Sequence, residues 1–313
     1  MALTDKLTSI ANAIRTQTDT TDKMTLDEMP EKISKLSDIS SYFNTNVRVT
    51  QPMNGNINRM FIKKLPDITL DYGNTADTTK RDAVTRLFNG YIELTEIPNV
   101  NLINCDLPYM NFEAIIGSCS KLTNIENLKK LFAKYEADSL AYLFSESALS
   151  EDIIKDIVSS IKPISQNYGT FGGGDVGKMF YNNKMLTEVT MFDTTYYNNF
   201  NQMFYYCSNL IAIINIIDMS SATRTDYMFQ GCTKLETVSI KNLGKTRPSS
   251  TTLNLGISSL DKLTHTSLVG ILKGLYDISQ TDWTGLNLKL GSKLQSLSDE
   301  EKKIATDKGW VLS

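Results

Sequence analysis

Histidine and cysteine are scarce in this 313-residue sequence, which has one histidine, His265, and four cysteines. A metal site built from several histidines is therefore excluded, and no two cysteines form the CxxC pair that commonly binds zinc. We expect no metal and no cofactor. The cysteines should be free thiols that pack as small apolar side chains: Cys105, Cys119, Cys207 and Cys232.

An excess of charge is also missing, because 32 lysines and arginines nearly balance 35 aspartates and glutamates, for a net charge of -3. The sequence therefore does not predict a nucleic-acid partner. The most apolar run, residues 210–217, is far shorter than the roughly 20 residues of a membrane-spanning helix. Residues 1–10 lack the basic and apolar parts of a secretory signal, so we expect neither membrane insertion nor Sec export.

The sequence contains no complete catalytic or nucleotide-binding motif. Residues 172–179 read GGGDVGKM, which matches GxxxxGK but has Met179 where a phosphate-binding loop needs a magnesium-binding hydroxyl. His265 has no nucleophile motif beside it and is interpreted as an exposed residue at a helix start. No pair of carboxylates stands out for glycoside cleavage, which depends on spatial separation. We expect no enzyme activity, and a cell-wall glycosidase remains the enzymatic alternative.

Internal repeats organise the chain. MFYNNKMLTEV from Met179, MFYYCSNLIAI from Met203 and MFQGCTKLETV from Met228 start 24 and 25 residues apart, a period typical of repeat proteins. Weaker copies begin at Leu87 and Ile115, and partial copies begin at Leu143 and Met60. Each unit has one small apolar face that only stacking can bury, so we expect parallel strands with polar turns outside.

These repeats resemble the BspA-type leucine-rich repeats, whose units carry an MFxxCxxLxxL-like core, here MFYYCSNLIAI and MFQGCTKLETV. The resemblance implies an α+β fold, a leucine-rich-repeat solenoid over residues 41–255 that is used for adhesion or recognition. Its repeats are clear at 179–243 and weaker at 60–160. Cys119, Cys207 and Cys232 occupy equivalent positions and should lie in the core.

The N-terminal residues predict a helical hairpin with one apolar side. Helical spacing and a capping box at Thr25 and Glu28 place its apolar residues on one face: Leu3, Leu7, Ile10, Ile14, Met29, Ile33 and Leu36. The pattern alone leaves two roles open. The hairpin either covers the end of the stack, or docks into a larger assembly.

Residues 1–36 also resemble the N-terminal module of tail-tip and baseplate-associated proteins from phages of Gram-positive bacteria. The matching motifs are IxxAIR at Ile10 to Arg15 and MTxxEMPxxI at Met24 to Ile33. The resemblance implies that residues 1–40 attach to other tail or baseplate proteins. It places the protein in the distal tail of a virion, after synthesis in the bacterial cytoplasm, as a homo-oligomer with a trimer common among tail fibres.

Residues 256–313 predict a C-terminal cap of helix, strand and helix. Leu268, Ile271, Leu272 and Leu275 have helical spacing, GLNLKLG alternates as a strand does, and Ser298 and Glu301 form a capping box. The segment ends in Gly309 and Trp310. It resembles the terminal segment found after BspA-type repeats in many phage tail proteins.

Aromatic and amide side chains crowd residues 194–209. Flat rings suit the faces of sugars, and amides hydrogen-bond to hydroxyls. The predicted ligand-binding residues are Tyr196, Tyr197, Asn198, Asn199, Tyr205, Tyr206 and Tyr227. A competing interpretation places about half of the tyrosines in the core. Our hypothesis is a phage receptor-binding or adhesion protein that recognises a host cell-surface glycan or protein, with an architectural baseplate component or a bacterial surface adhesin as alternatives.

Overall fold

The computed structural model describes residues 63–313 except 66, 74 and 167–173. The predicted attachment face lies outside the described residues: Leu3, Leu7, Ile10, Ile14, Met29, Ile33 and Leu36. The start of the shortened repeat at Met60 lies outside them as well.

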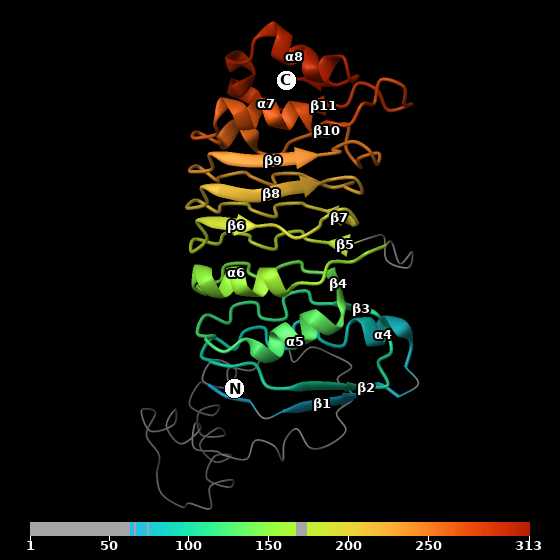
Figure 1. The fold of residues 1–313 in the computed structure, drawn as a ribbon, viewed down its shortest axis with the longest axis vertical. Coiled ribbons are helices and arrows are strands. Elements are labelled where there is room, and N and C mark those ends of the chain that lie inside the picture. The colour runs from blue at the N-terminus through green and yellow to red at the C-terminus, as the bar shows by residue number, and fades with distance from the viewer. Residues whose placement is uncertain (1–62, 66, 74, 167–173) are drawn as a thin grey trace, which may run out of the picture.

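The described chain is an elongated stack that rises from β1 at one end to α8 at the other (Figure 1). The helices are α4 (Asp77–Arg81), α5 (Glu126–Lys134), α6 (Glu151–Ser160), α7 (His265–Lys273) and α8 (Asp299–Thr306), with short 3-10 helices at Ile257–Ser259 and Gly291–Ser296. The strands are β1 (Ile68–Asp71), β2 (Val100–Ile103), β3 (Tyr109–Asn111), β4 (Glu136–Ser139), β5 (Gly174–Asp175), β6 (Glu188–Thr190), β7 (Tyr197–Asn199), β8 (Ala212–Asp218), β9 (Thr237–Lys241), β10 (Thr252–Leu253), β11 (Asn287–Leu288) and β12 (Val311–Leu312).

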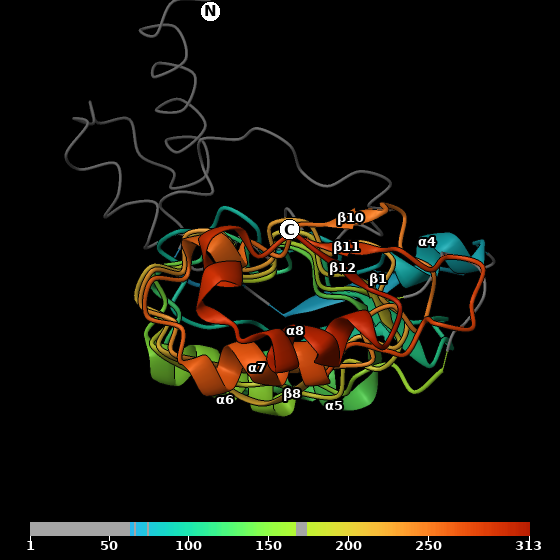
Figure 2. The same cartoon turned by 90° about the horizontal axis from the view of Figure 1, so that it is seen from above.

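The strands of the described chain form four small parallel sheets, β1-β2, β3-β4-β5-β7, β6-β8-β9 and β10-β11-β12. Figure 2, viewed along the stack, shows α5 to α8 on the same side as β8 and the sheet β10-β11-β12 on the opposite side. Helix α6 packs against β6, and α7 packs against β9. In the register of the middle sheet, Val189 pairs with Ile213, and Ile217 pairs with Ile240.

The expected fold class, an α+β leucine-rich-repeat solenoid, is wrong. The described chain is α/β, with separate small parallel sheets and helices between them. The physical reason is that the segment after the repeat start differs between repeats. The Met179, Met203 and Met228 segments lead into β6, β8 and β9, but those at Ile115 and Leu143 lead into α5 and α6. A continuous sheet of repeat strands therefore cannot form.

Helices replace strands there because the apolar residues have helical spacing. The buried residues of α5 are Leu128, Leu131 and Phe132, and those of α6 are Ile154, Ile157 and Val158. Each set has the i, i+3, i+4 pattern that puts side chains on one helix face. In α6 the Ser150 side chain also accepts a hydrogen bond from the backbone N–H of Ile153, which caps the helix N-terminus.

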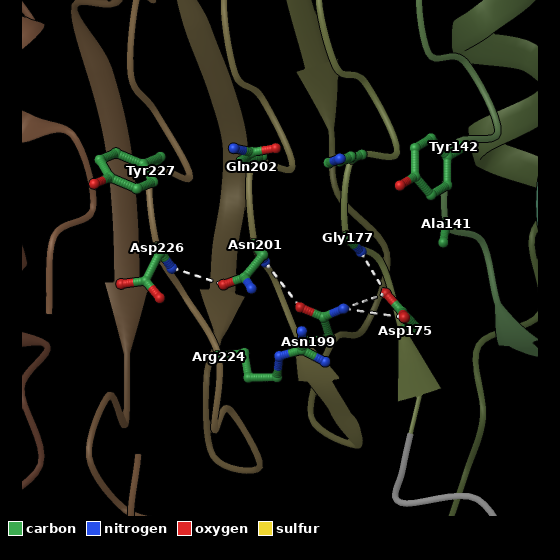
Figure 3. Close-up of a pocket in the computed structure, with 11 residues that line it drawn as sticks. Ala141, Tyr142, Asp175, Gly177, Asn199, Asn201, Gln202, Arg224, Asp226 and Tyr227 are labelled. Carbon is green, nitrogen blue, oxygen red and sulfur yellow. Dashed lines mark hydrogen bonds between the residues drawn. The ribbon is translucent and has the colours of Figure 1, made fainter. Parts of the chain in front are cut away.

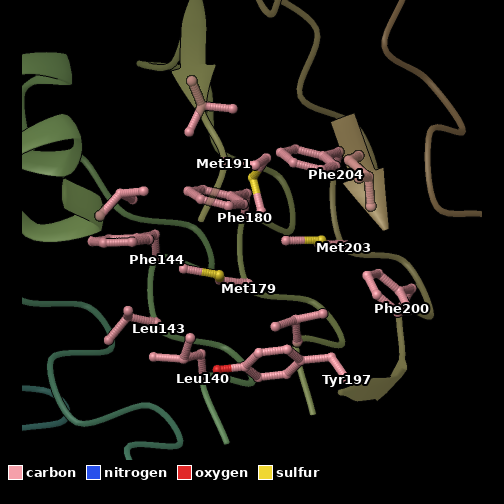
Figure 4. Packing of buried hydrophobic residues seen from close by; sticks show 14 of the residues in the cluster. Leu140, Leu143, Phe144, Met179, Phe180, Met191, Tyr197, Phe200, Met203 and Phe204 are labelled. Atoms are coloured by element: carbon pink, nitrogen blue, oxygen red, sulfur yellow. The ribbon is translucent and has the colours of Figure 1, made fainter. Parts of the chain in front are cut away.

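The repeats still stack, and we call the chain around one repeat start a layer. Phenylalanines at the second repeat position pack ring on ring: centroids are 5.3 Å apart for Phe144 and Phe180, 5.0 Å for Phe180 and Phe204, and 6.0 Å for Phe204 and Phe229. Figure 4 shows three of these rings in a row beside Met179 and Met203. The column is fully buried and forms the centre of the core.

The cysteines do more than fill space. In three layers the thiol at the fifth repeat position donates a hydrogen bond of 2.9 Å to a phenylalanine carbonyl one layer back: Cys119 to Phe88, Cys207 to Phe180 and Cys232 to Phe204. In the Met179 layer, Asn183 takes this position and donates to the Phe144 carbonyl at 3.2 Å. Each of these buried carbonyls already accepts one backbone hydrogen bond, and the Cys or Asn side chain supplies a second donor that solvent cannot provide there.

Two residues of each layer have a positive φ, the one just before the repeat start and the one three residues after it. They are Arg86 and Gly90, Ala114 and Ser118, Tyr142 and Glu146, Lys178 and Asn182, Gln202 and Tyr206, and Tyr227 and Gly231. This backbone directs alternate N–H groups toward the next layer, as from Lys178 to the Asn201 carbonyl at 2.9 Å. The strain of left-handed residues is offset by these bonds.

The C-terminal helices form where the sequence predicts them. Thr264 caps α7, and Ser298 and Glu301 form the predicted capping box of α8. His265 is exposed at the first residue of α7, with Nε2 2.7 Å from a Glu301 carboxylate oxygen. Within the described ranges, no helix has the length and apolar character needed to cross a membrane.

The phenylalanine column predicts a stability difference. Phe204→Ala removes a fully buried ring between two others, so we expect unfolding free energy to fall by about 3–5 kcal/mol. Ile216→Ala, at a side chain that is 53% exposed, should cost about 1 kcal/mol or less. Urea unfolding followed by circular dichroism measures both. Equal losses in the two variants would contradict the role of the column.

Burial of the cysteines predicts that their thiols react slowly with thiol reagents in the folded protein. Burial raises the pKa of Cys119 to about 12 and also raises the pKa of Cys105 and Cys207. Because the thiolate is the reactive form, the folded protein should not react with a thiol reagent near neutral pH. All four cysteines should react after denaturation. A thiol that reacts at once in the folded protein would show that the core is open.

Candidate functional site

A polar groove of about 550 Å³ lies on one side of the stack (Figure 3). Its lining comes from the same positions of four successive layers. The residues just before the repeat starts are Tyr142, Lys178, Gln202 and Tyr227. The residues two positions before the repeat starts are Ala141, Gly177, Asn201 and Asp226. The residues four positions before the repeat starts are Asp175, Asn199 and Arg224. The groove therefore runs along the stack and crosses all four layers.

Hydrogen bonds fix the floor of the groove. Asn199 Nδ2 donates to both carboxylate oxygens of Asp175 at 3.0 Å, and Gly177 N donates to Asp175 Oδ1 at 2.7 Å. Asn201 N donates to Asn199 Oδ1 at 3.1 Å, and Asp226 N donates to Asn201 Oδ1 at 2.8 Å. The carboxylate and amides are thus held in place before any ligand arrives, which lowers the entropy cost of binding.

Burial raises the pKa of Asp175. The hydrogen bonds from Asn199 and Gly177 act in the opposite direction but do not cancel the cost of removing the carboxylate from water. The positive charge of Arg224 also acts to lower the pKa, as the weakest of these influences. The ionised form of Asp175 is therefore less favourable in the folded chain than in water.

Two tyrosines mark the ends of the groove (Figure 3). Tyr142 is 37% exposed, and Tyr227 is 44% exposed. Lys178 Nζ lies 5.2 Å from the centroid of the Tyr142 ring and 5.6 Å from that of Tyr181, so a cation–π contact holds the lysine against aromatic faces. The small residue Ala141 leaves room below Tyr142.

An aromatic surface adjoins the groove on the turns. Tyr181 and Tyr205 stack with centroids 5.2 Å apart, and Tyr206 meets Tyr205 edge-on at 4.6 Å. The ring of Tyr206 lies over Gly231, where an added Cβ would come within 2.9 Å of it. Glycine at position 231 thus permits the ring to lie across the next layer. Lys184 Nζ is 5.7 Å from the Tyr206 centroid.

The predicted ligand-binding residues lie in different parts of the structure. Asn199 and Tyr227 line the groove, and Tyr205 and Tyr206 belong to the adjoining aromatic surface. Tyr196 is exposed but does not line the groove, and Asn198 is half-buried, with a backbone carbonyl that accepts hydrogen bonds from the next layer.

Tyr197 lies in the core. Its side chain is fully buried, and its hydroxyl donates to the Ala137 carbonyl at 2.6 Å. It therefore cannot contact a ligand. This agrees with the competing interpretation, in which part of the tyrosines are core residues.

Sequence reasoning missed most of the groove, including Tyr142, Lys178, Gln202 and Arg224. The signal was present, because all four lie just before a repeat start or four residues before it. The segment GGGDVGKM, in its described part from Gly174, forms β5 and the turn into the Met179 repeat. Asp175, Gly177 and Lys178 of this segment all line the groove. Among the described residues, no group of three or more His, Cys, Asp or Glu side chains could hold a metal ion.

Residues 174–259 match a family described as Mycoplasma protein of unknown function, DUF285. The match covers the three clear repeats and three of the four layers of the groove. No curated protein and no solved structure matches the chain. Since the matched family has no known function, the chemistry of the groove is the guide to what the protein does.

The Asp175 carboxylate predicts a pH effect on stability. Because the folded chain holds the Asp175 proton more tightly than the unfolded chain, ionisation above the ordinary pKa of 3.8 lowers stability. The melting temperature of Asp175→Asn minus that of the wild type should therefore grow as the pH rises above about 4. Thermal unfolding across this range tests it, with Asp261→Asn, at an exposed carboxyl, as control. A difference that stays constant would contradict the assignment.

Proposed function

We propose that the protein is a non-enzymatic recognition protein that binds a carbohydrate chain of a cell surface in the polar groove. One observation carries the proposal: exposed tyrosines stand at both ends of a groove whose floor is made of fixed amides and carboxylates. Sugars present apolar faces and many hydroxyls. Tyrosine rings suit the faces, and amide and carboxylate groups hydrogen-bond to the hydroxyls.

The length of the groove favours a chain over a single sugar. Three layer steps separate Tyr142 from Tyr227, and successive phenylalanines in the same layers are 5.0 to 6.0 Å apart. A monosaccharide cannot reach both tyrosines at once. An extended oligosaccharide that lies along the stack can contact both, with Gln202 and Asn201 between them (Figure 3).

The biological setting of this proposal is adsorption at the distal tail of a phage or phage-tail-like particle. It is supported by the resemblance of residues 1–36 and of the C-terminal segment to phage tail proteins. Residues 1–40 would join the protein to the particle, and the groove would bind a glycan of a Gram-positive host. Several copies on one particle, as in a trimer, would turn weak contacts into strong attachment.

A purely architectural baseplate role is the second candidate, and one observation favours it. Exposed apolar side chains lie on β8, at Ile214 and Ile216, and in the segments that lead into β8 and its neighbour β6, at Ile211 and Met185. Apolar patches on a surface often mark protein contacts. In that case the outer face of β8, rather than the groove, would carry the main interaction.

The tyrosines test the carbohydrate proposal. Tyr142→Ala and Tyr227→Ala should each weaken binding to any glycan that the wild type selects from an array, by about tenfold, because a stacking platform is lost. Ala114 holds the equivalent position of an earlier layer with the same positive φ, so alanine suits this backbone.

Tyr276→Ala is the matched control, since this tyrosine is equally exposed but lies outside the groove. It should bind as the wild type does. If the wild type binds no glycan on the array, or if the three variants bind alike, the carbohydrate proposal is wrong and the architectural role takes its place.

A further inference from the structure

One residue of the groove departs from a pattern that four successive layers share. In the Ile115, Leu143, Met179 and Met203 layers, the side chain four residues before the repeat start accepts a hydrogen bond from the backbone N–H two residues later. The pairs are Asn111 with Glu113 N at 2.8 Å, Ser139 with Ala141 N at 3.3 Å, Asp175 with Gly177 N at 2.7 Å, and Asn199 with Asn201 N at 3.1 Å. This short turn closes each layer at the end of its strand.

Arg224 holds this position in the Met228 layer and cannot perform the task, because a guanidinium has donors only. The backbone N–H of Asp226 therefore has no acceptor on residue 224, and it donates to Asn201 Oδ1 at 2.8 Å instead. Asn201 belongs to the layer below. The chain therefore tolerates an arginine here because a side chain from the neighbouring layer takes over the missing acceptor.

Within the protein the guanidinium gains only a weak charge attraction to Asp175, and no direct contact. Arg224 is exposed, lines the groove, and forms no side-chain hydrogen bond or ion pair with the described part of the chain. Its backbone alone is engaged, with N donating to the Asn198 carbonyl and O accepting from Phe200 N. A residue that departs from the local pattern without a stabilising contact is expected at functional sites.

We propose that Arg224 determines specificity by binding an anionic group, a carboxylate or a phosphate, on the chain that occupies the groove. This inference rests on the carbohydrate proposal and narrows its ligand to an acidic glycan. A guanidinium binds either group through two parallel hydrogen bonds. Lys178 supplies a second positive charge in the groove. The carboxylates of Asp175 and Asp226 also line the groove and disfavour an anion beside them, so the anionic group is expected to lie against the guanidinium itself.

Arg224→Asn tests the inference, because it restores the residue type that caps the Asn199 layer. The wild type and the variant are applied to an array of neutral, carboxylated and phosphorylated oligosaccharides, so that the two sources of negative charge are separated. We expect the wild type to favour acidic chains, less so at high salt. The variant should bind those chains about tenfold or more weakly and lose the preference for acidic over neutral chains.

Two further measurements keep the outcome clear. Lys303→Gln removes one positive charge on α8, at the far end of the stack, and should leave the preference unchanged. Thermal unfolding of Arg224→Asn should give a melting temperature equal to or above that of the wild type. A lower value would show that Arg224 has a structural role and would overturn the inference.

The failures of the two proposals are distinguishable. If the wild type binds only neutral chains, or if Arg224→Asn keeps the preference for acidic ones, the assignment of Arg224 is wrong while carbohydrate binding stands. If no oligosaccharide of any charge binds, the carbohydrate proposal fails and the assignment falls with it.

Discussion

Polar backbone groups that are buried at the start of each repeat must find partners one layer away, and the rest of the structure depends on this constraint. The left-handed residues on either side of the repeat start direct N–H groups to the next layer. The cysteines or Asn183 donate in the other direction, to phenylalanine carbonyls. These bonds bring the phenylalanine rings to stacking distance, so hydrogen bonding and apolar burial stabilise the same arrangement.

The same constraint organises the surface. Because equivalent residues of successive layers lie about one strand spacing apart, roughly 5 Å, each repeat position forms a row along the stack. The groove consists of three such rows. Its shape depends on which residues occupy them: small residues hollow one end, amides fill the floor, and tyrosines close the ends. The core chemistry and the groove chemistry are thus set by different positions of one repeat.

Spacing alone located the repeats at Met179, Met203 and Met228, the parallel pairing of the strands after them, and the capping box of α8. It failed at the Ile115 and Leu143 repeats, where the segment after the repeat start folds as α5 or α6 and divides the sheets. At the site, Asn199 could be found because it lies in the aromatic and amide cluster at 194–209, and Tyr227 because it follows one repeat later. Tyr142 could not, since 36 residues separate it from Lys178 in the sequence and only the stacking makes them neighbours.

The left-handed residues before the repeat starts have a consequence for variation. Arginine, alanine, tyrosine, lysine and glutamine all occupy this position, and each contributes its backbone N–H to the layer above regardless of side chain. The backbone therefore does not constrain which side chain faces the groove. Substitutions at these positions can therefore change the lining of the groove one layer at a time while the buried columns stay as they are.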